Sequence, residues 1–373
     1  MVVLLKHNGF LLDVFEEGFV IPKPRRGPRI LFIELTTECN LNCKMCFRRT
    51  MTEPRGFMDE KLFKKILNDA EECGVDFIWF GGWGEPTYHP KFLEFAEDVK
   101  SRGFKLGINT NGTLLSSDYA EKLVKLGVDR ITISIDAAMP QTYAEIRGGV
   151  LKNILSATSL IHGMKKSIGT LYPILEFSYV MMKSNADEVL KLFEIAEKHG
   201  VGRIIISNVI PISESLVSEC IYGNSFNYER IVEKIAIKTL ETNVGAAVPE
   251  FELKTERRCL FIENNACCVT WNGEVAPCYN FLHNYIAYVY GVRKEMKQIS
   301  FGNIKDKSLG EIWRSPEYQK FRFKVRYFKF PSCTDCKFHD ICDFATSNLM
   351  DCWGNEPSCA DCLFSRGIVQ CPL

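Results

Sequence analysis

The 373-residue sequence has no net charge and no long hydrophobic run. Its 46 basic residues balance 46 acidic ones, so no overall field attracts nucleic acid or an anionic membrane. No apolar stretch approaches the length that crosses a bilayer. Residues 1–18 carry acidic side chains early and lack a small-residue cleavage site, which argues against a signal peptide. We therefore expect a soluble, cytoplasmic protein that binds neither nucleic acid nor membrane.

Cysteine, in contrast, is abundant. So many cysteines rarely form a disulfide framework in a reducing compartment, and the 16 present favour metal binding. Three lie at 39–46, Cys73 and Cys220 stand alone, and eleven fall from Cys259 onward. Because the composition changes there, we predict a domain boundary near residue 245. The domains would be a hairpin with a linker at 1–28, a strand–helix domain at 29–245 and a cysteine-rich domain at 246–373.

The middle of the chain alternates short β-branched or aromatic runs with amphipathic stretches, which predicts an α/β fold with a parallel sheet. Six such units cannot close an eightfold barrel, so we expect a partial (β/α)6 barrel with ligands at the C-terminal ends of its strands. Residues 1–22 are predicted to form a hairpin around His7. The predicted strands are 29–35, 75–80, 104–109, 130–135, 173–181 and 203–208, and the predicted helices lie near 59–73, 91–102, 117–127, 150–164 and 186–199.

Three cysteines, Cys39, Cys43 and Cys46, follow directly after the first predicted barrel strand. Three thiolates can hold three irons of a cubane and leave the fourth iron open to a substrate, whereas electron carriers close the cluster with four thiolates. The alternatives are a zinc site with one ligand missing, a disulfide, or chance. Zinc usually takes four ligands arranged as C-x2-C pairs, and this spacing differs from that.

The Cys-x3-Cys-x2-Cys spacing after a first strand resembles the radical SAM superfamily. The resemblance implies that Cys39, Cys43 and Cys46 hold a 4Fe-4S cluster whose open iron binds S-adenosylmethionine (SAM). It also implies that one electron from the cluster cleaves SAM to a 5'-deoxyadenosyl radical, which abstracts hydrogen, and that the fold is a radical SAM partial barrel.

Further SAM contacts are implied by the same resemblance. The loop at 81–86 resembles the family's Gly-Glu-Pro loop, in which Gly82, Gly84 and Glu85 would hold the SAM amino group, although a plain tight turn looks similar. Arg147 would bind the SAM carboxylate. The remaining candidates are Ser134 and Asp136 toward the ribose, Asn109 before the cavity-facing turn, and Met45 beside adenine. A helix cap or turn explains Ser134 and Asp136 equally well, and Met45 would also suit the core.

The C-terminal cysteines resemble the SPASM extension of radical SAM maturases through Cys259-x13-Gly273-x4-Cys278 and the Cys333-x2-Cys336-x5-Cys342 run. This resemblance implies two auxiliary 4Fe-4S clusters. The pattern asks for another cysteine at position 346, which is threonine. Cys352 can supply that ligand, and either Cys371 or the pair Cys359 and Cys362 can supply the last one. A zinc ribbon is the rival interpretation, and Cys267 and Cys268 have no assigned role.

A narrower resemblance lies in residues 277–284 and 351–372, which are similar to tungsten cofactor oxidoreductase maturases. It implies maturation of a tungsten-dependent aldehyde ferredoxin oxidoreductase or its tungstopterin, with a reductant such as ferredoxin. The alternatives are a peptide- or sulfatase-modifying enzyme and a non-catalytic iron–sulfur or zinc scaffold. In sulfatase maturases an aspartate follows the cysteine of the Gly-x4-Cys element, where this chain has Tyr279.

Overall fold

A nine-stranded sheet organises the protein in the computed structural model, which describes residues 3–7, 10–14, 20–22, 26–223 and 226–373. All six strands predicted for the barrel are confirmed, and neighbouring pairs among them are parallel. They are β4 (Ile30–Ile33), β5 (Phe77–Phe80), β6 (Lys105–Thr110), β7 (Arg130–Ser134), β8 (Ile174–Met181) and β9 (Arg203–Asn208).

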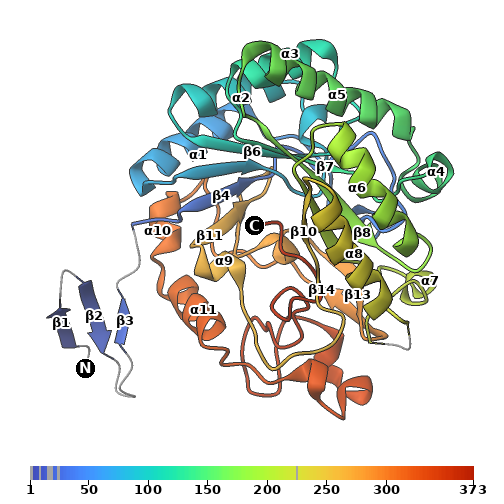
Figure 1. Cartoon of the computed structure of the whole chain (residues 1–373). Helices are drawn as coiled ribbons and strands as arrows, with labels where there is room; N and C mark the ends of the chain where they lie inside the picture. Colours follow the sequence, from blue (N-terminus) through green and yellow to red (C-terminus); the bar gives the residue numbers. More distant parts are fainter. Residues whose placement is uncertain (1–2, 8–9, 15–19, 23–25, 224–225) are drawn as a thin grey trace.

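Helices cover the outside of this curved sheet (Figure 1). The five predicted ones are α1 (Glu60–Cys73), α2 (Phe92–Ser101), α3 (Ser117–Lys125), α5 (Leu151–Ile168) and α6 (Val189–Lys198). In α1, Asp59 caps the N-terminus, left-handed Gly74 ends the helix, and an apolar stripe that includes Phe63 packs on the sheet. Three further helices were not predicted individually: α4 (Pro140–Arg147), α7 (Glu214–Val217) and α8 (Glu229–Glu241).

Segments from residue 245 onward extend the sheet at both ends. β10 (Gly245–Ala247) pairs in parallel with β9, while β11 (Ala266–Val269) pairs in parallel with β4. β12 (Val275–Ala276) folds back on β11 through a turn in which Gly273 has a φ of 97°, a conformation that favours glycine. The sheet therefore includes strands from both sides of the predicted domain boundary near residue 245. That boundary stays a prediction.

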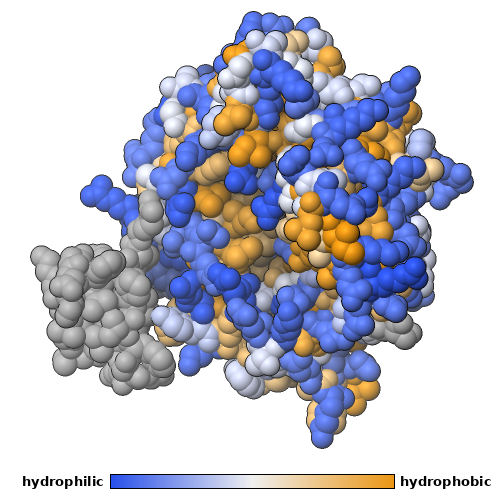
Figure 2. Space-filling view, viewed as in Figure 1, coloured by the Kyte–Doolittle hydropathy of each residue, from blue (hydrophilic) through white to orange (hydrophobic). Residues whose placement is uncertain are grey.

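The rest of the cysteine-rich segment is built from short elements. Its hairpin is β13 (Tyr285–Val289) with β14 (Val292–Met296), and its helices are α9 (Leu260–Glu263), α10 (Leu309–Trp313) and α11 (Pro316–Arg326). The C-terminal residues return to the barrel, where Gln370 N donates to Ser207 Oγ at 3.0 Å and Asn208 Nδ2 donates to the Ile368 carbonyl at 2.8 Å. The C-terminus thus lies between β10 and β11 (Figure 1), beside a hollow with apolar walls (Figure 2).

At the N-terminus, β1 (Val3–His7), β2 (Phe10–Val14) and β3 (Val20–Pro22) form a separate antiparallel sheet. The predicted pairing around His7 is confirmed, with His7 opposite Phe10, while residues 8–9 of its turn and residues 23–25 of the linker lie outside the described residues. In the described parts of the chain, none of the helices has the length and apolar character to cross a bilayer.

Candidate active site

The loop after β4 brings Cys39, Cys43 and Cys46 together at the C-terminal edge of the sheet. The Cys46 N–H donates to the Cys43 carbonyl at 3.2 Å, and the Cys39 sulfur accepts from Leu41 N at 3.4 Å and Asn111 Nδ2 at 3.6 Å. None of the sixteen cysteines, all of which lie in the described residues, forms a disulfide. The sulfur donors of the predicted motif therefore share one loop, and N–H groups are directed at one of them, the Cys39 sulfur.

Electrostatics show that the three thiols are close neighbours. Burial raises the pKa of Cys39 and raises that of Cys43 to about 11; Cys46 adds to both increases, and Cys39 adds to that of Cys43. Behind the loop, the buried Arg48 guanidinium donates to the Thr37 and Leu41 carbonyls, while its Nε has no partner. Crowded thiols backed by a buried cation fit an anionic iron–sulfur cluster, because metal binding favours thiolates that otherwise repel one another. Arg48 was not predicted from the sequence.

The glycine loop after β5 packs directly on the cysteine loop. A Cβ on Gly84 would lie 2.1 Å from the Thr36 carbonyl oxygen and 2.7 Å from that of Glu38. The Glu85 N–H donates to the Glu38 carbonyl at 2.8 Å, and a Cβ on Gly82 would overlap the Glu34 side chain. Glycine is therefore required where the two loops meet.

Glu85 is buried beneath this contact. Its Oε1 accepts from Thr87 N, Thr87 Oγ1 and Thr110 Oγ1, and its Oε2 accepts from Asn111 N at 2.6 Å. Burial raises the carboxyl pKa, and these hydrogen bonds act in the opposite direction. The observed role of Glu85 is to fix the glycine loop against the turn after β6, while its predicted contact with SAM stays a prediction.

Asp136 and Arg147 form a buried ion pair at the same edge. Arg147 Nε donates to Asp136 Oδ2 at 2.6 Å, and Val180 N donates to Asp136 Oδ1 at 2.6 Å. Burial works to lower the Arg147 pKa, but the Asp136 carboxylate and the Cys43 thiol outweigh it and the pKa is raised. The Arg147 carbonyl lies 3.9 Å from the Cys43 sulfur, so this pair holds a cation beside the cysteine loop.

The other predicted SAM contacts also lie along this edge. Ser134 ends β7 and is partly exposed, Asn109 on β6 would touch a Cβ on Gly81 at 2.9 Å, and Met45 packs partly buried against the core. Asp136 is completely buried, so its carboxylate acts on Arg147 and not at the surface. Contacts of these residues with ribose or adenine remain predictions.

Two residues from the cysteine-rich segment complete the site. The Tyr279 hydroxyl donates to the Gly82 carbonyl at 2.8 Å. His283 Nε2 lies 2.7 Å from Glu34 Oε2, while Glu34 Oε1 accepts from Trp83 N at 2.9 Å. Glu34 and His283 were not predicted, because nothing in one sequence relates positions 249 residues apart.

The remaining cysteines fall into two sets. The inner set consists of Cys259, Cys278, Cys359, Cys362 and Cys371. The charges of these thiols raise one another's pKa values, and Cys362 acts on all four of the others. The outer set consists of Cys333, Cys336, Cys342 and Cys352. The charge of Cys352 raises the pKa of Cys333, and short hydrogen-bonded turns connect Cys333 to Cys336 and Cys342. Cys336 and Cys352 are exposed. Nowhere in the described ranges do three His, Cys, Asp or Glu side chains converge as around a single metal ion.

Burial dominates the chemistry of the inner set. It raises the pKa of Cys259 to about 12 and raises the pKa of Cys278, Cys359 and Cys362 as well. Five partly buried thiols, with no disulfide among them, fit the donor set of a closed cluster, which needs four. Cys268 on β11 lies near Cys278 and is itself buried.

Comparison with known proteins decides the family. A model described as the radical SAM superfamily matches residues 33–176, and a model of the SPASM iron–sulfur cluster-binding domain matches residues 259–337. A protein of Pyrococcus furiosus, named tungsten-containing aldehyde ferredoxin oxidoreductase cofactor-modifying protein, is 41% identical over 92% of this chain and 97% of its own. The chain belongs to the radical SAM–SPASM family.

More distant relatives of this radical SAM–SPASM protein have other names. An AdoMet-dependent heme synthase of Methanosarcina barkeri is 25% identical over 85% of this chain and 90% of its own. In fold, the protein resembles the crystal structure of Streptococcus suis SuiB bound to S-adenosylmethionine, with a TM-score of 0.62 and 18% identity over 86% of this chain and 73% of that one. It also resembles anSMEcpe with bound AdoMet, with a TM-score of 0.60 and 17% identity over 85% of each chain.

Proposed function

We propose that this protein is a radical SAM enzyme that matures a tungsten-containing oxidoreductase or its cofactor. The observation that carries the SAM chemistry is the convergence of the Cys39, Cys43 and Cys46 loop, the glycine loop and the Asp136–Arg147 pair at one edge of the sheet. When bound there, a 4Fe-4S cluster supplies the electron that cleaves SAM reductively to a 5'-deoxyadenosyl radical.

The chain's own residues bind and orient in this proposal. Cys39, Cys43 and Cys46 hold the cluster, and Arg48 offsets its negative charge from behind the loop. The loop of Gly82 and Gly84 receives the SAM amino group, since glycine lets the backbone approach a ligand closely. Arg147 faces the SAM carboxylate with its remaining donors while Asp136 fixes its Nε.

For the auxiliary clusters we infer one ligand group from each set of cysteines. Cys333, Cys336, Cys342 and Cys352 provide four thiols for the outer cluster, so Cys352 takes the place of the missing cysteine at position 346. The inner cluster draws four of its five thiols from Cys259, Cys278, Cys359, Cys362 and Cys371. We further propose a cytoplasmic location, in keeping with the lack of a disulfide among the sixteen cysteines, and a reductant such as ferredoxin as the electron source.

The tungsten target rests on the relative that is 41% identical over nearly its full length. Of the alternatives, sulfatase-type maturation is disfavoured because Tyr279 stands at the position of the expected aspartate, with its hydroxyl bound to the Gly82 carbonyl.

The SAM chemistry is tested by incubating anaerobic, iron-loaded protein with SAM and dithionite and measuring 5'-deoxyadenosine. We expect product from the wild type and none from the C39A/C43A/C46A triple variant. A C73A/C220A control removes two cysteines that lie apart from these sites and should retain activity. Absence of 5'-deoxyadenosine from loaded wild type would refute the enzyme proposal.

The target is tested separately. Aldehyde ferredoxin oxidoreductase made in cells that lack this protein is incubated with it, SAM and dithionite, and aldehyde oxidation is then measured. We expect activity to rise with wild type and to stay unchanged with the triple variant. If 5'-deoxyadenosine forms but oxidoreductase activity does not change, the target is wrong and the SAM chemistry stands.

A further inference from the structure

Buried hydrogen-bond donors without a partner lie around the loop that carries the first three cysteines. Within the described part of the chain they include Arg48 Nε, Trp83 Nε1 and the Tyr143 hydroxyl. Arg48 lies two residues after Cys46, Trp83 in the glycine loop packs on Phe47 with ring centroids 5.4 Å apart, and Tyr143 belongs to α4. A buried donor that stays unpaired has lost its hydration without compensation. Such donors beside a set of thiols indicate an acceptor bound at the thiols.

Helix α4, which carries Tyr143, ends against the cysteine loop. Lys44 N donates to the Ile146 carbonyl at 2.7 Å, and the Cys43 sulfur lies 3.9 Å from the Arg147 carbonyl. Both carbonyls belong to the last turn of the helix, and Tyr143 lies one turn earlier. The helix end is therefore held in contact with the loop by backbone atoms.

The Tyr143 side chain is completely buried, and its hydroxyl lies near the middle of the cysteine loop. A Cβ on Gly149 would lie 3.7 Å from the Tyr143 hydroxyl oxygen and 3.6 Å from Leu41 Cδ2, so these two groups are neighbours. Leu41 stands between Cys39 and Cys43 in the chain. The hydroxyl is therefore placed beside the segment that joins these two thiols.

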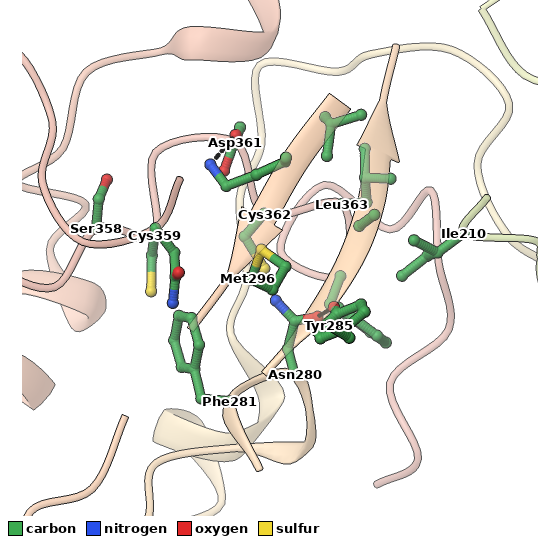
Figure 3. Close-up of a pocket in the computed structure, with 15 residues that line it drawn as sticks. Ile210, Asn280, Phe281, Tyr285, Met296, Ser358, Cys359, Asp361, Cys362 and Leu363 are labelled. Atoms are coloured by element: carbon green, nitrogen blue, oxygen red, sulfur yellow. Dashed lines mark hydrogen bonds and ion pairs between the residues drawn. The ribbon is translucent and has the colours of Figure 1, made fainter. Parts of the chain in front are cut away.

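Two other tyrosines near the same loops have partners within the protein. The Tyr279 hydroxyl donates to a carbonyl of the glycine loop at 2.8 Å. Tyr285 packs on Phe47 with ring centroids 4.7 Å apart, and its hydroxyl donates to Asn280 Oδ1 in the cavity beside the inner set of cysteines (Figure 3). Tyr143 differs from both, because its hydroxyl is buried and has no partner among the described residues.

We propose that the Tyr143 hydroxyl donates a hydrogen bond to a sulfur of the cluster that Cys43 helps to hold, and that this bond raises the reduction potential of the cluster. The inference rests on the proposed function for the presence of the cluster. A phenol suits this role because its ordinary pKa of about 10 lets it keep its hydrogen at neutral pH. Reduction adds a negative charge to the cluster, and a hydrogen bond donated to sulfur stabilises that charge.

The test is a redox titration of full-length, iron-loaded protein without SAM, followed by electron paramagnetic resonance (EPR). The relevant signal is the one that the C39A/C43A/C46A variant lacks. We expect Y143F to lower the midpoint potential of this signal while the iron content stays at the wild-type level. Y318F is the matched control, because it removes the hydroxyl of another fully buried tyrosine, whose ring packs on Phe301 and Trp313, and it should leave the potential unchanged.

A second variant keeps the test decisive if Y143F loses its cluster. Fluorotyrosine incorporated at position 143 keeps the hydroxyl and makes it a stronger donor, so at slightly acidic pH it should raise the potential. Electron–nuclear double resonance of the reduced protein in deuterated water should also show one exchangeable hydrogen fewer in Y143F than in the wild type.

Equal potentials in wild type and both Tyr143 variants, with iron content unchanged, would overturn the inference. It would equally be overturned if Y143F weakened SAM binding and left the potential unchanged, because the hydroxyl would then bind SAM and not the cluster. Iron-free wild-type protein would instead refute the proposed function, so the two failures are distinguishable.

Discussion

His283 and Glu34 join the cysteine-rich segment to the first strand of the barrel through a hydrogen bond of 2.7 Å between side chains that are 3% and 1% exposed. The same carboxylate accepts from Trp83 N in the glycine loop at 2.9 Å, and the His283 ring packs edge-on against Trp83 with centroids 5.0 Å apart. One buried pair thus fixes the glycine loop, the end of β4 and the segment after Cys278 relative to one another.

This pair predicts a pH-dependent stability. Burial works to lower the His283 pKa, but the charge and hydrogen bond of Glu34 and the charge of Glu53 outweigh it, so the pKa is raised in the folded protein. Stabilisation is then complete below the unfolded pKa of about 6.5 and is lost as pH rises through the folded value. H283Q should lower stability by about 3–5 kcal/mol at pH 6 and flatten this loss. Thermal unfolding at several pH values measures both effects.

The control for that experiment is H162Q. Burial and the charges of Lys166 and Lys165 lower the His162 pKa, so its contribution has the opposite sign. H162Q should therefore keep the loss of stability at rising pH. A wild-type profile that coincides with that of H283Q would contradict the charged pair.

Gly84 tests the contact between the glycine and cysteine loops. Its Cβ in a G84A variant would lie 2.1 Å from the Thr36 carbonyl oxygen, so one backbone must move. We expect loss of SAM cleavage with the auxiliary clusters retained, measured as 5'-deoxyadenosine and iron per chain. G202A, where the added methyl has open space around it, is the matched control. Normal SAM cleavage by G84A would refute close packing of the loops.

Asp136 tests the buried pair with Arg147. It has a φ of 51°, a conformation that asparagine tolerates better than most residues. D136N keeps an acceptor for Val180 N and removes the charge, whereas D136A removes both and leaves Arg147 unpaired, at a cost of about 3–5 kcal/mol. Urea unfolding should rank D136A below D136N and both below wild type, with exposed Asp118 replaced by asparagine as the control. Equal stability of D136A and wild type would contradict the pair.

Tyr279 tests the link from Cys278 to the SAM loop. Y279F keeps the ring and removes the 2.8 Å hydrogen bond to the Gly82 carbonyl. A net loss of about 0.5–1.5 kcal/mol corresponds to SAM binding weakened roughly 2- to 13-fold, measured by equilibrium dialysis. Y172F, at a tyrosine that is 49% exposed, should bind SAM like the wild type. If Y279F binds as tightly as Y172F, the hydroxyl does not position the loop.

Local patterns predicted most of the barrel. The six strands and the apolar face of α1 follow from periodicity, and the cysteine loop follows from a motif placed after a buried strand. Helix α4 gave a weaker signal because it is short and only Tyr143, Ile146 and Arg147 are buried in it. These features depend on residues close in sequence, which is why one sequence sufficed for them.

Long-range pairings were not predictable in the same way. β11 pairs with β4, and Cys267 lies opposite Leu31, although the sequence pattern predicts no strand over Ala266–Val269. The position of Lys294 against Asp361 likewise depends on tertiary packing over 67 residues of chain. Such contacts leave no periodic trace in a single sequence.

The most direct test of the central claim, that Cys39, Cys43 and Cys46 hold a cluster with an iron open to SAM, is EPR of the reduced, oxygen-protected protein before and after SAM is added. The account predicts that SAM shifts one cluster signal in the wild type, and that the C39A/C43A/C46A variant lacks this signal and about one third of the iron. Iron-free wild type, or a spectrum that SAM leaves unchanged, would contradict it.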